Sequence, residues 1–164
     1  MARALWKLIS QPGILNGTPL KSLTWRLIGL RIGKRVFDDG CAISEPTLVS
    51  IGDDCTLNSG TVLQSHSMED GIFKSDHIAV GAGCTLASGA FVHYGVTIGD
   101  GASLGTDSFL MKGEEIPPHA RWGGNPARQL PTAMPTPALG LSVDASPAGA
   151  VAWVGATVAA RPAR

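Results

Sequence analysis

The sequence predicts an all-β fold in which short strands stack as successive coils. The first observation is a period of six: every sixth residue from 80 to 116 is a branched aliphatic, namely Val80, Leu86, Val92, Ile98, Leu104, Leu110 and Ile116. The second is that the fifth place of each hexad is small or β-branched, as at Cys84, Ala90, Val96, Ala102 and Ser108. The third is that Gly and Asp gather in the places between, where a chain turns corners. A period of six fits neither a helix nor a plain strand and is typical of stacked β-coils.

The spacing also assigns a face to each place in the hexad. The fifth residue of one hexad and the first of the next, such as Val96 and Ile98, are two apart and point the same way on an extended strand. We expect both to point inward and the residue between them, here Thr97, to point outward.

These hexads resemble those of the hexapeptide-repeat transferases. The resemblance implies a left-handed parallel β-helix of triangular cross-section, with three hexads in each coil and about four to five coils in this chain. The handedness and the triangle come from the resemblance, whereas the period itself indicates only short strands with regular corners.

Residues 1–31 do not follow the hexad and are predicted to form a short helical cap. Apolar residues recur at helical spacing in Ala4–Ile9 and again in Leu20–Leu30, with a turn region between two prolines separating them. A cap would cover the unpaired backbone groups and the open apolar end of the first coil. The alternative use of these helices is membrane association through Trp6 and Trp25.

Residues 32–130 are predicted to form the β-helix, and its first coil is irregular. Phe37, Ile43 and Val49 keep a six-residue step as expected inward residues, and the register then jumps two places to Ile51.

An insertion interrupts the hexads after the second coil. The aliphatic that follows Leu63 is Val80, 17 residues later where six are expected. The eleven extra residues must leave the coil as a loop within residues 64–79, because a core built of identical layers cannot absorb them. Excursions from a regular scaffold are where function is usually found.

The repeat ends at Pro117 and Pro118, because proline cannot continue a ladder of backbone hydrogen bonds. A turn at residues 121–128 follows. From residue 131 the composition shifts to Pro, Ala and Thr without a period, and we predict that residues 131–164 form a mostly disordered C-terminal tail.

Composition limits the class of protein. A length of 164 residues predicts one domain, and 13 basic residues balance 13 acidic ones, which argues against nucleic acid or an anionic membrane as the main partner. Three cysteines without paired spacing argue for a reducing compartment. There is no signal-peptide layout and no apolar segment of spanning length, so a cytoplasmic protein is expected.

Counting hexads brings two histidines to one corner. Once the eleven extra residues are removed, Leu63 and Val92 are one coil apart, so His66 and His93 lie on neighbouring coils with backbones roughly 8 Å apart. Both are candidate catalytic residues, and the alternative is that one or both are merely solvated. His77 and His119 receive no functional role.

The family resemblance extends to the order of the motifs. Free-standing acetyltransferases of the family carry a catalytic histidine where the chain leaves the coil, resume a hexad run, and close with a Gly-x-Pro-Ala-like motif beside coenzyme A. In this chain His66, the run from Val80 and residues 124–127 follow that order. The resemblance implies that His66 is the general base and that the donor channel is bordered by Trp122, Gly124, Asn125 and Pro126. The alternative is that this turn only closes the last coil.

A closer resemblance covers about residues 3–130. The motifs that carry it include Val36–Gly40, Thr56–Asn58, Gln64–His66, Glu69-Asp70, Lys74–Asp76, Phe109–Glu114 and Trp122–Pro126. They look like part of the C-terminal region of non-ribosomal-peptide-synthetase-like proteins of the polylysine-synthetase type. There, tandem acyltransferase-like domains are implicated in joining aminoacyl units held on a carrier protein.

These observations predict an enzyme that transfers an acyl or aminoacyl group. The donor would be a pantetheine thioester of coenzyme A or a carrier protein, the acceptor a small amine or hydroxyl compound, and no metal is expected. An imidazole is a suitable base at neutral pH. Glu69 or Asp70 is a candidate to hold the tautomer of His66, and Asn58 and Gln64 are candidate substrate contacts. Corner N–H groups near Gly89 or Gly95 are candidate donors to the developing oxyanion.

Two rival functions remain open. Zinc lyases of the carbonic-anhydrase type share the fold, and His66, His77 and His93 are the residues from which such a triad would have to be built. The other rival is a non-catalytic scaffold or partner module of a synthetase assembly. By resemblance, we expect a homotrimer.

Overall fold

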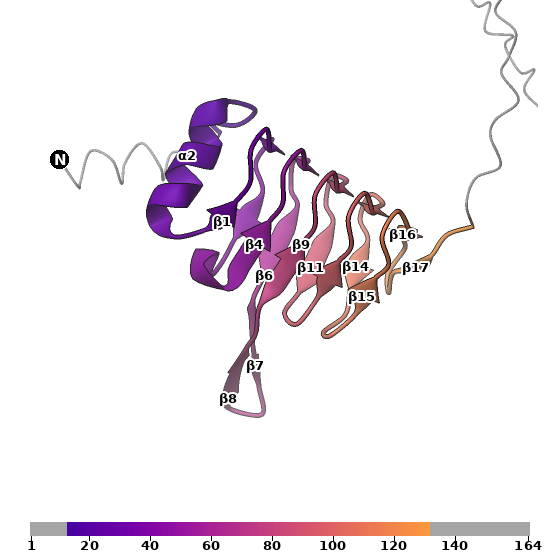
Figure 1. Cartoon of the computed structure of the whole chain (residues 1–164). Coiled ribbons are helices and arrows are strands. Elements are labelled where there is room, and N and C mark those ends of the chain that lie inside the picture. Colours follow the sequence, from indigo (N-terminus) through magenta and orange to yellow (C-terminus); the bar gives the residue numbers. More distant parts are fainter. Residues whose placement is uncertain (1–12, 132–164) are drawn as a thin grey trace, which may run out of the picture. The chain divides into compact units, whose positions relative to one another are not determined.

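The computed structural model describes residues 13–131 (Figure 1). The helix predicted at Ala4–Ile9 lies outside the described residues, as does the tail predicted at residues 131–164 apart from its first residue. The first coil contains β1 (Arg31–Ile32), β2 (Phe37–Asp38), β3 (Ala42–Ile43) and the 3-10 helix η1 (Pro46–Leu48), and the second contains β4 (Val49–Ile51), β5 (Thr56–Leu57) and β6 (Val62–Gln64). The later coils contain β9 (Ile78–Val80), β10 (Thr85–Leu86), β11 (Phe91–His93), β12 (Thr97–Ile98), β13 (Ser103–Leu104), β14 (Phe109–Leu110), β15 (Glu115–Ile116), β16 (Arg121–Gly123) and β17 (Arg128–Gln129).

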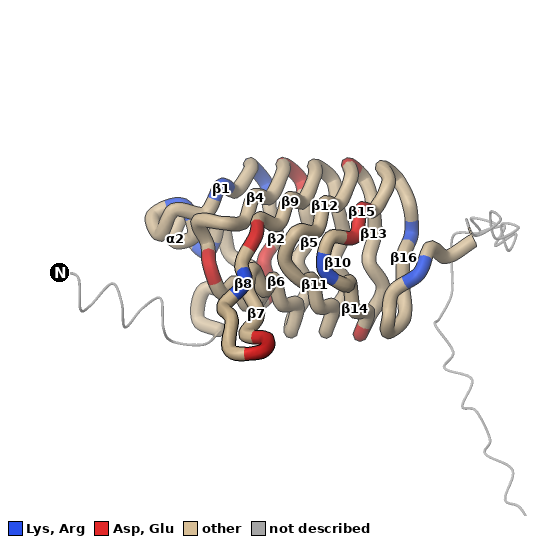
Figure 2. The backbone as a smooth tube through the Cα atoms, turned by 90° about the horizontal axis from the view of Figure 1, so that it is seen from below, with Lys and Arg blue, Asp and Glu red and all other residues tan. Residues whose placement is uncertain are grey.

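The strands form three parallel sheets, and each turn of the chain adds one strand to each sheet. Sheet A has the order β1-β4-β9-β12-β15, sheet B the order β2-β5-β10-β13-β16, and sheet C the order β3-β6-β11-β14, with β17 antiparallel to β16 at the end of sheet B. The result is a three-sided parallel β-helix of four full coils and two sides of a fifth (Figures 1 and 2). The predicted fold class is therefore confirmed.

The core is a set of aliphatic columns inside the triangle. From the second coil onward every predicted aliphatic place is buried, as at Ile51, Leu57, Leu63, Val80, Leu86, Val92, Ile98, Leu104, Leu110 and Ile116. Corresponding residues lie in register, so that Leu86 pairs with Leu57 on one side and with Leu104 on the other. Each such side chain contributes about 1.5–3 kcal/mol by leaving water, which makes the columns the main source of stability.

The first coil differs from the prediction at Phe37. This side chain is 45% exposed, whereas Asp38 is 1% exposed and takes the inward place in register with the leucine of β5. Asp38 is tolerated there because its carboxylate accepts hydrogen bonds from the N–H groups of Gly40 (2.9 Å) and Cys41 (2.8 Å) and from the indole N–H of Trp25 (2.7 Å). A buried charge persists only when it is satisfied in this way.

Helix α2 (Pro19–Ile28) covers the open end of the first coil. It begins with Pro19 at a position where a missing N–H is harmless, and it ends at Gly29, whose φ of 105° gives a left-handed cap. The Ser22 hydroxyl donates to Val36 O at 3.2 Å, and Trp25 packs against the core. Within residues 13–131, no helix has both the length and the apolar character needed to cross a membrane.

The inserted residues leave the stack as an antiparallel hairpin made of β7 (His66–Glu69) and β8 (Ile72–Ser75) (Figure 1). Asp70 and Gly71 form its turn, both with positive φ (51° and 74°), which is the geometry of a type I′ turn. His66 is therefore the first residue of the hairpin, at its junction with the coil.

Candidate active site

Ionisable side chains from four coils meet at the corner between sheets C and A, which we call the C–A corner. It contains Glu45 before η1, His66 at the start of β7, His93 at the end of β11 and Lys112 after β14. His93 lies in register with Gln64, two residues before His66. Burial lowers the pKa of His93, and a positive charge on the neighbouring His66 lowers it further.

His66 lies between a carboxylate and an aromatic ring. Its Nδ1 is 2.6 Å from Oε1 of Glu45, a close contact that is off the line of an ideal hydrogen bond and becomes an ion pair when the ring is protonated. Its ring stacks on Phe73 of β8, with centroids 5.2 Å apart and planes at 19°. Glu45 is held in turn by the hydroxyl of Ser44, which also accepts the N–H of Ser65 at 3.3 Å. This arrangement leaves Nε2 of His66 as the ring atom available to a substrate.

Glu45 is the residue that sequence reasoning missed. It lies 21 residues before His66 in the least regular coil of the chain, and no motif or spacing links the two. A signal was nevertheless present in the sequence. The extra residues after Ile43 break the repeat, and a break in a repeat marks a functional position whether it is short or as long as the later insertion.

His93 is a half-buried neutral donor. Its Nδ1 accepts the backbone N–H of Tyr94 at 3.1 Å, so the neutral ring carries its proton on Nε2. The ring meets Phe91, Tyr94 and Phe109 at centroid distances of 5.9, 4.9 and 6.1 Å. Burial among these groups, followed by the charge of His66, lowers the pKa of His93, so the ring is neutral at pH 7.

Glu69 and Asp70 do not contact His66. Along β7 the side chains alternate, so Glu69 faces away from the side that carries His66. Its carboxylate accepts from Ser67 Oγ (3.1 Å) and Lys74 Nζ (3.2 Å), while Asp70 lies at the tip of the hairpin.

The other contacts of Glu69 fasten the hairpin to the coils. Its carboxylate pairs with Lys112 Nζ, and that ammonium lies 5.5 Å from the ring centroid of Tyr94. Ser67 Oγ and the Tyr94 hydroxyl are also within hydrogen-bond distance, 3.3 Å apart. These contacts hold β7, and with it His66, against the corner.

Gln64 and Asn58 have different environments. The Gln64 amide donates to the backbone O of His66 at 3.1 Å, so it supports the root of the hairpin. Asn58 lies at the corner between sheets B and C, which we call the B–C corner, and its amide donates to Leu86 O at 2.9 Å. Asn58 is therefore not at the corner that contains the histidines.

The backbone donors expected at Gly89 and Gly95 are already used. The N–H of Gly89 donates to Ser59 O at 3.1 Å, and the N–H of Gly95 donates to His77 O at 2.8 Å. Both belong to the ladder between coils, so neither is free to bind an oxyanion.

The turn at residues 122–126 closes the last coil. Trp122 takes an inward place in register with Leu104, and its buried indole N–H has no hydrogen-bond partner among the described residues. The Gly124 N–H donates to Ser108 Oγ at 3.1 Å, and its carbonyl accepts from Phe109 at 3.0 Å. Asn125 and Pro126 follow at the B–C corner, so sheet C separates this turn from His66 within one chain.

His77 lies beyond the hairpin, exposed, with Nδ1 3.5 Å from Oδ1 of Asp76. Among residues 13–131 no three His, Cys, Asp or Glu side chains are grouped closely enough to hold a metal ion.

No family model matches the chain. The chain is 36% identical over 127 residues to a delta-poly-L-ornithine synthetase of Acinetobacter baumannii, a match that covers 76% of this chain and 10% of that protein. It is 28% identical over 127 residues to the putative colanic acid biosynthesis acetyltransferase WcaF of Escherichia coli, covering 62% of this chain and 69% of that one. The chain is therefore similar both to a part of a polymer synthetase and to a putative acetyltransferase.

Solved structures of hexapeptide-repeat acetyltransferases share this fold. A hexapeptide-repeat-containing acetyltransferase of Vibrio cholerae, solved with acetyl coenzyme A, superposes with a TM-score of 0.63 at 17% identity, covering 79% of this chain and 87% of that one. The fold is therefore the left-handed β-helix expected from the sequence. This hexapeptide-repeat chain spans about a tenth of the length of the ornithine-polymer synthetase that it matches.

Proposed function

We propose that this chain is an acyltransferase that moves an acyl group from a pantetheine thioester to an amine or hydroxyl, with His66 as general base. The observation that carries the proposal is the position of His66 at the junction of hairpin and coil, with a carboxylate 2.6 Å from Nδ1. A histidine held in this way presents a basic Nε2 outward, which is the arrangement that general-base catalysis needs.

The reaction proceeds by addition and elimination. The acceptor N–H or O–H loses its proton to His66 Nε2 as the acceptor atom bonds to the thioester carbonyl carbon. The tetrahedral intermediate then collapses, the carbon–sulfur bond breaks, and the leaving thiolate takes the proton back from the imidazolium. Glu45 stabilises the imidazolium that exists between these two transfers.

His93 is proposed as the donor to the oxyanion. Its proton lies on Nε2 because Nδ1 accepts from Tyr94, and its lowered pKa keeps the ring neutral beside a second histidine that becomes charged during the reaction. A neutral imidazole can donate to the carbonyl oxygen without competing for the proton that His66 carries. This role replaces the backbone donors at Gly89 and Gly95, which the ladder occupies.

The donor site is proposed to need a second copy of the chain. The turn at Trp122, Gly124, Asn125 and Pro126 lies on the far side of sheet C from His66, so one chain does not bring the two together. In a homotrimer the turn of one subunit would face the C–A corner of its neighbour, with coenzyme A or a carrier pantetheine between them. Light scattering should then give a mass of three 16.9-kDa chains, and a monomer with full activity would contradict this part of the proposal.

The acyl group is proposed to be an aminoacyl unit held on a carrier protein. The support is the likeness to a synthetase named for poly-L-ornithine, which is stronger in identity than the likeness to the named acetyltransferase. Acetyl coenzyme A is the simpler donor to test first.

The test is thiol release from acetyl coenzyme A with a panel of amines and alcohols, followed by an aminoacyl-loaded carrier domain as donor. The native protein should release thiol only when an acceptor is present, and His66→Ala should lower the rate by roughly 10²–10⁴-fold. His77→Ala is the matched control, since His77 is exposed beside Asp76 and should leave the rate unchanged. A folded His66→Ala protein with full activity would exclude His66 as the base. A native protein inactive with both donors would favour the non-catalytic module.

A further inference from the structure

Charge is distributed very unevenly along this chain. Residues 1–37 contain seven Lys or Arg and no Asp or Glu, whereas residues 38–164 contain six Lys or Arg and thirteen Asp or Glu. Figure 2 shows basic positions around α2 and β1 and mostly acidic positions along the remaining coils. Although the net charge of the chain is zero, its N-terminal part is basic. Such asymmetry is typical of proteins that bind an anionic surface.

The outer face of α2 is apolar and has no partner among residues 13–131. Leu20, Leu23 and Leu27 are spaced three and four residues apart and are 56%, 50% and 66% exposed. They lie on the side of the helix opposite to Ser22 and Trp25, which pack on the first coil. A helix that is apolar on both sides indicates a second contact surface.

Three basic side chains lie at the same end of the molecule as this leucine stripe, around α2 and β1 (Figure 2). Arg26, Arg31 and Lys34 are exposed, and none of them has a carboxylate within ion-pair distance among the described residues. Arg26 donates to the carbonyls of Ile32 and Gly33, contacts that fix the guanidinium without neutralising it. Unlike these three, Arg35 is paired with Asp54.

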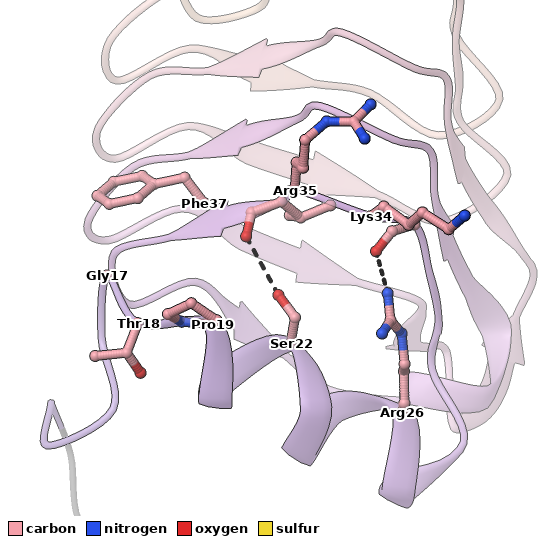
Figure 3. Close-up of a pocket in the computed structure, with 10 residues that line it drawn as sticks. Gly17, Thr18, Pro19, Ser22, Arg26, Lys34, Arg35 and Phe37 are labelled. Atoms are coloured by element: carbon pink, nitrogen blue, oxygen red, sulfur yellow. Dashed lines mark hydrogen bonds between the residues drawn. The ribbon is translucent and has the colours of Figure 1, made fainter.

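A recess opens beside the helix. It is a cavity of about 410 Å³ between the first half of α2 and the first corner of the coil, with Lys34 and Phe37 among the residues at its edge (Figure 3). Phe37, 45% exposed, adds apolar surface next to the cationic groups.

We propose that this end of the molecule docks on an anionic membrane surface. The leucine stripe would lie in the boundary between headgroups and acyl chains, and Arg26, Arg31 and Lys34 would contact the headgroups. Lipid is favoured over nucleic acid because the centre of the surface is a row of leucines, for which a phosphate backbone offers no partner. The ten-residue helix would lie in the membrane plane, since it is far too short to span. The proposal replaces the expectation from net charge alone that no membrane is involved.

Vesicle flotation tests this proposal with the full chain. The native protein should bind vesicles of phosphatidylcholine with phosphatidylglycerol at low salt, and bind much less at high salt or to phosphatidylcholine alone. Leu23→Glu with Leu27→Glu should weaken binding at least about ten-fold. Removing two charges with Arg31→Gln and Lys34→Gln should weaken it about 25-fold, or about five-fold for each charge.

Matched controls use equally exposed residues elsewhere. Ile72→Glu, on the hairpin and 59% exposed, controls for loss of an exposed apolar side chain. Arg121→Gln with Arg128→Gln, at the last coil, controls for loss of charge. Both controls should bind as the native protein does, and all the substituted positions are exposed enough for the variants to fold.

Five results would overturn the proposal. The first is no binding of the native protein to anionic vesicles. The second is equal weakening by test and control variants. The third is vesicle binding that appears only when residues 2–12 are deleted, which would mean that this segment, and not a membrane, covers the leucine stripe in the native protein. The fourth is a native assembly that Leu27→Glu splits into smaller species without any vesicle binding, which would assign the stripe to a second copy. Duplex DNA binding that is insensitive to Leu23→Glu, together with no vesicle binding, would assign the charge to nucleic acid.

Discussion

Removing the charge of Glu45 is the sharpest test of the catalytic corner. Glu45→Gln keeps the shape of the side chain but removes the carboxylate that lies 2.6 Å from Nδ1 of His66. That carboxylate favours the resting tautomer with its proton on Nδ1 and stabilises the imidazolium that forms when His66 takes the acceptor proton, so its loss raises the barrier. Hydrogen bonds to charged groups contribute about 1.5–3 kcal/mol, a range that bounds from above the contact between Glu45 and the imidazolium. Both side chains are about a third exposed, so solvent screening favours the lower part of the range, about 1.5–2 kcal/mol. The expected loss in kcat/KM is roughly 10–30-fold.

The assay separates a positioning role from a general loss of structure. The loss should appear in kcat, with KM little changed, because Glu45 contacts His66 and not the acceptor. Glu115→Gln is the matched control: this glutamate is exposed on β15, forms no ion pair among the described residues, and should leave kcat unchanged. Both variants should unfold at the denaturant concentration of the native protein. A folded Glu45→Gln protein with native kcat would refute the reasoning and leave His66 without its partner.

Three further predictions concern stability. Asp38→Ala should lower the free energy of unfolding by about 3–5 kcal/mol, since it leaves buried donors unpaired, and a loss below about 1 kcal/mol in urea titration would contradict the account. Burial and His66 lower the pKa of His93, so the unfolded chain binds a proton on this histidine at higher pH than the folded chain does. The free energy of unfolding should therefore rise with pH up to about 6.5, the usual pKa of histidine. His93→Asn should flatten that rise. Gly52→Ala should cost about 3 kcal/mol or more, because a Cβ would lie 2.6–2.8 Å from the backbone of the next coil. Gly71→Ala, whose Cβ meets nothing within 4 Å, should cost only about 1 kcal/mol for its positive φ, and equal costs would contradict the steric argument.

The regular coils could be predicted because one physical rule governs all of them. Each inward place must fill the same narrow triangle, so the same residue type recurs every six positions, and Leu57, Leu86 and Leu104 form one column. The two-place jump from Val49 to Ile51 was visible for the same reason, and both side chains are buried. The outward places obey no such rule, which is why their partners could not be predicted.

Asp38 shows where the periodic rule fails. A side chain at an inward place loses its contact with water. An aliphatic side chain can occupy such a place, and so can a polar side chain that forms enough hydrogen bonds. Whether Asp38 has those bonds depends on Trp25 of the cap and on the turn at Gly40 and Cys41, which the period does not describe. Phe37 was the better candidate by polarity alone, and it lies outside because the neighbouring strand sets the register.

The irregular spacing of inward residues, which made the prediction wrong in the first coil, also positions Glu45 in the candidate site. The step from Asp38 to Ile43 is five residues and the step from Ile43 to Ile51 is eight, where a regular coil has six and six. The surplus forms η1 and pushes Glu45 out at the C–A corner, where the hairpin brings His66 within 2.6 Å. In a regular first coil those residues would form backbone hydrogen bonds to the next coil, and no carboxylate would lie beside His66. It follows that restoring the regular step, by deleting two residues of η1, should preserve the columns from Ile51 onward while reducing activity at least as much as Glu45→Gln does.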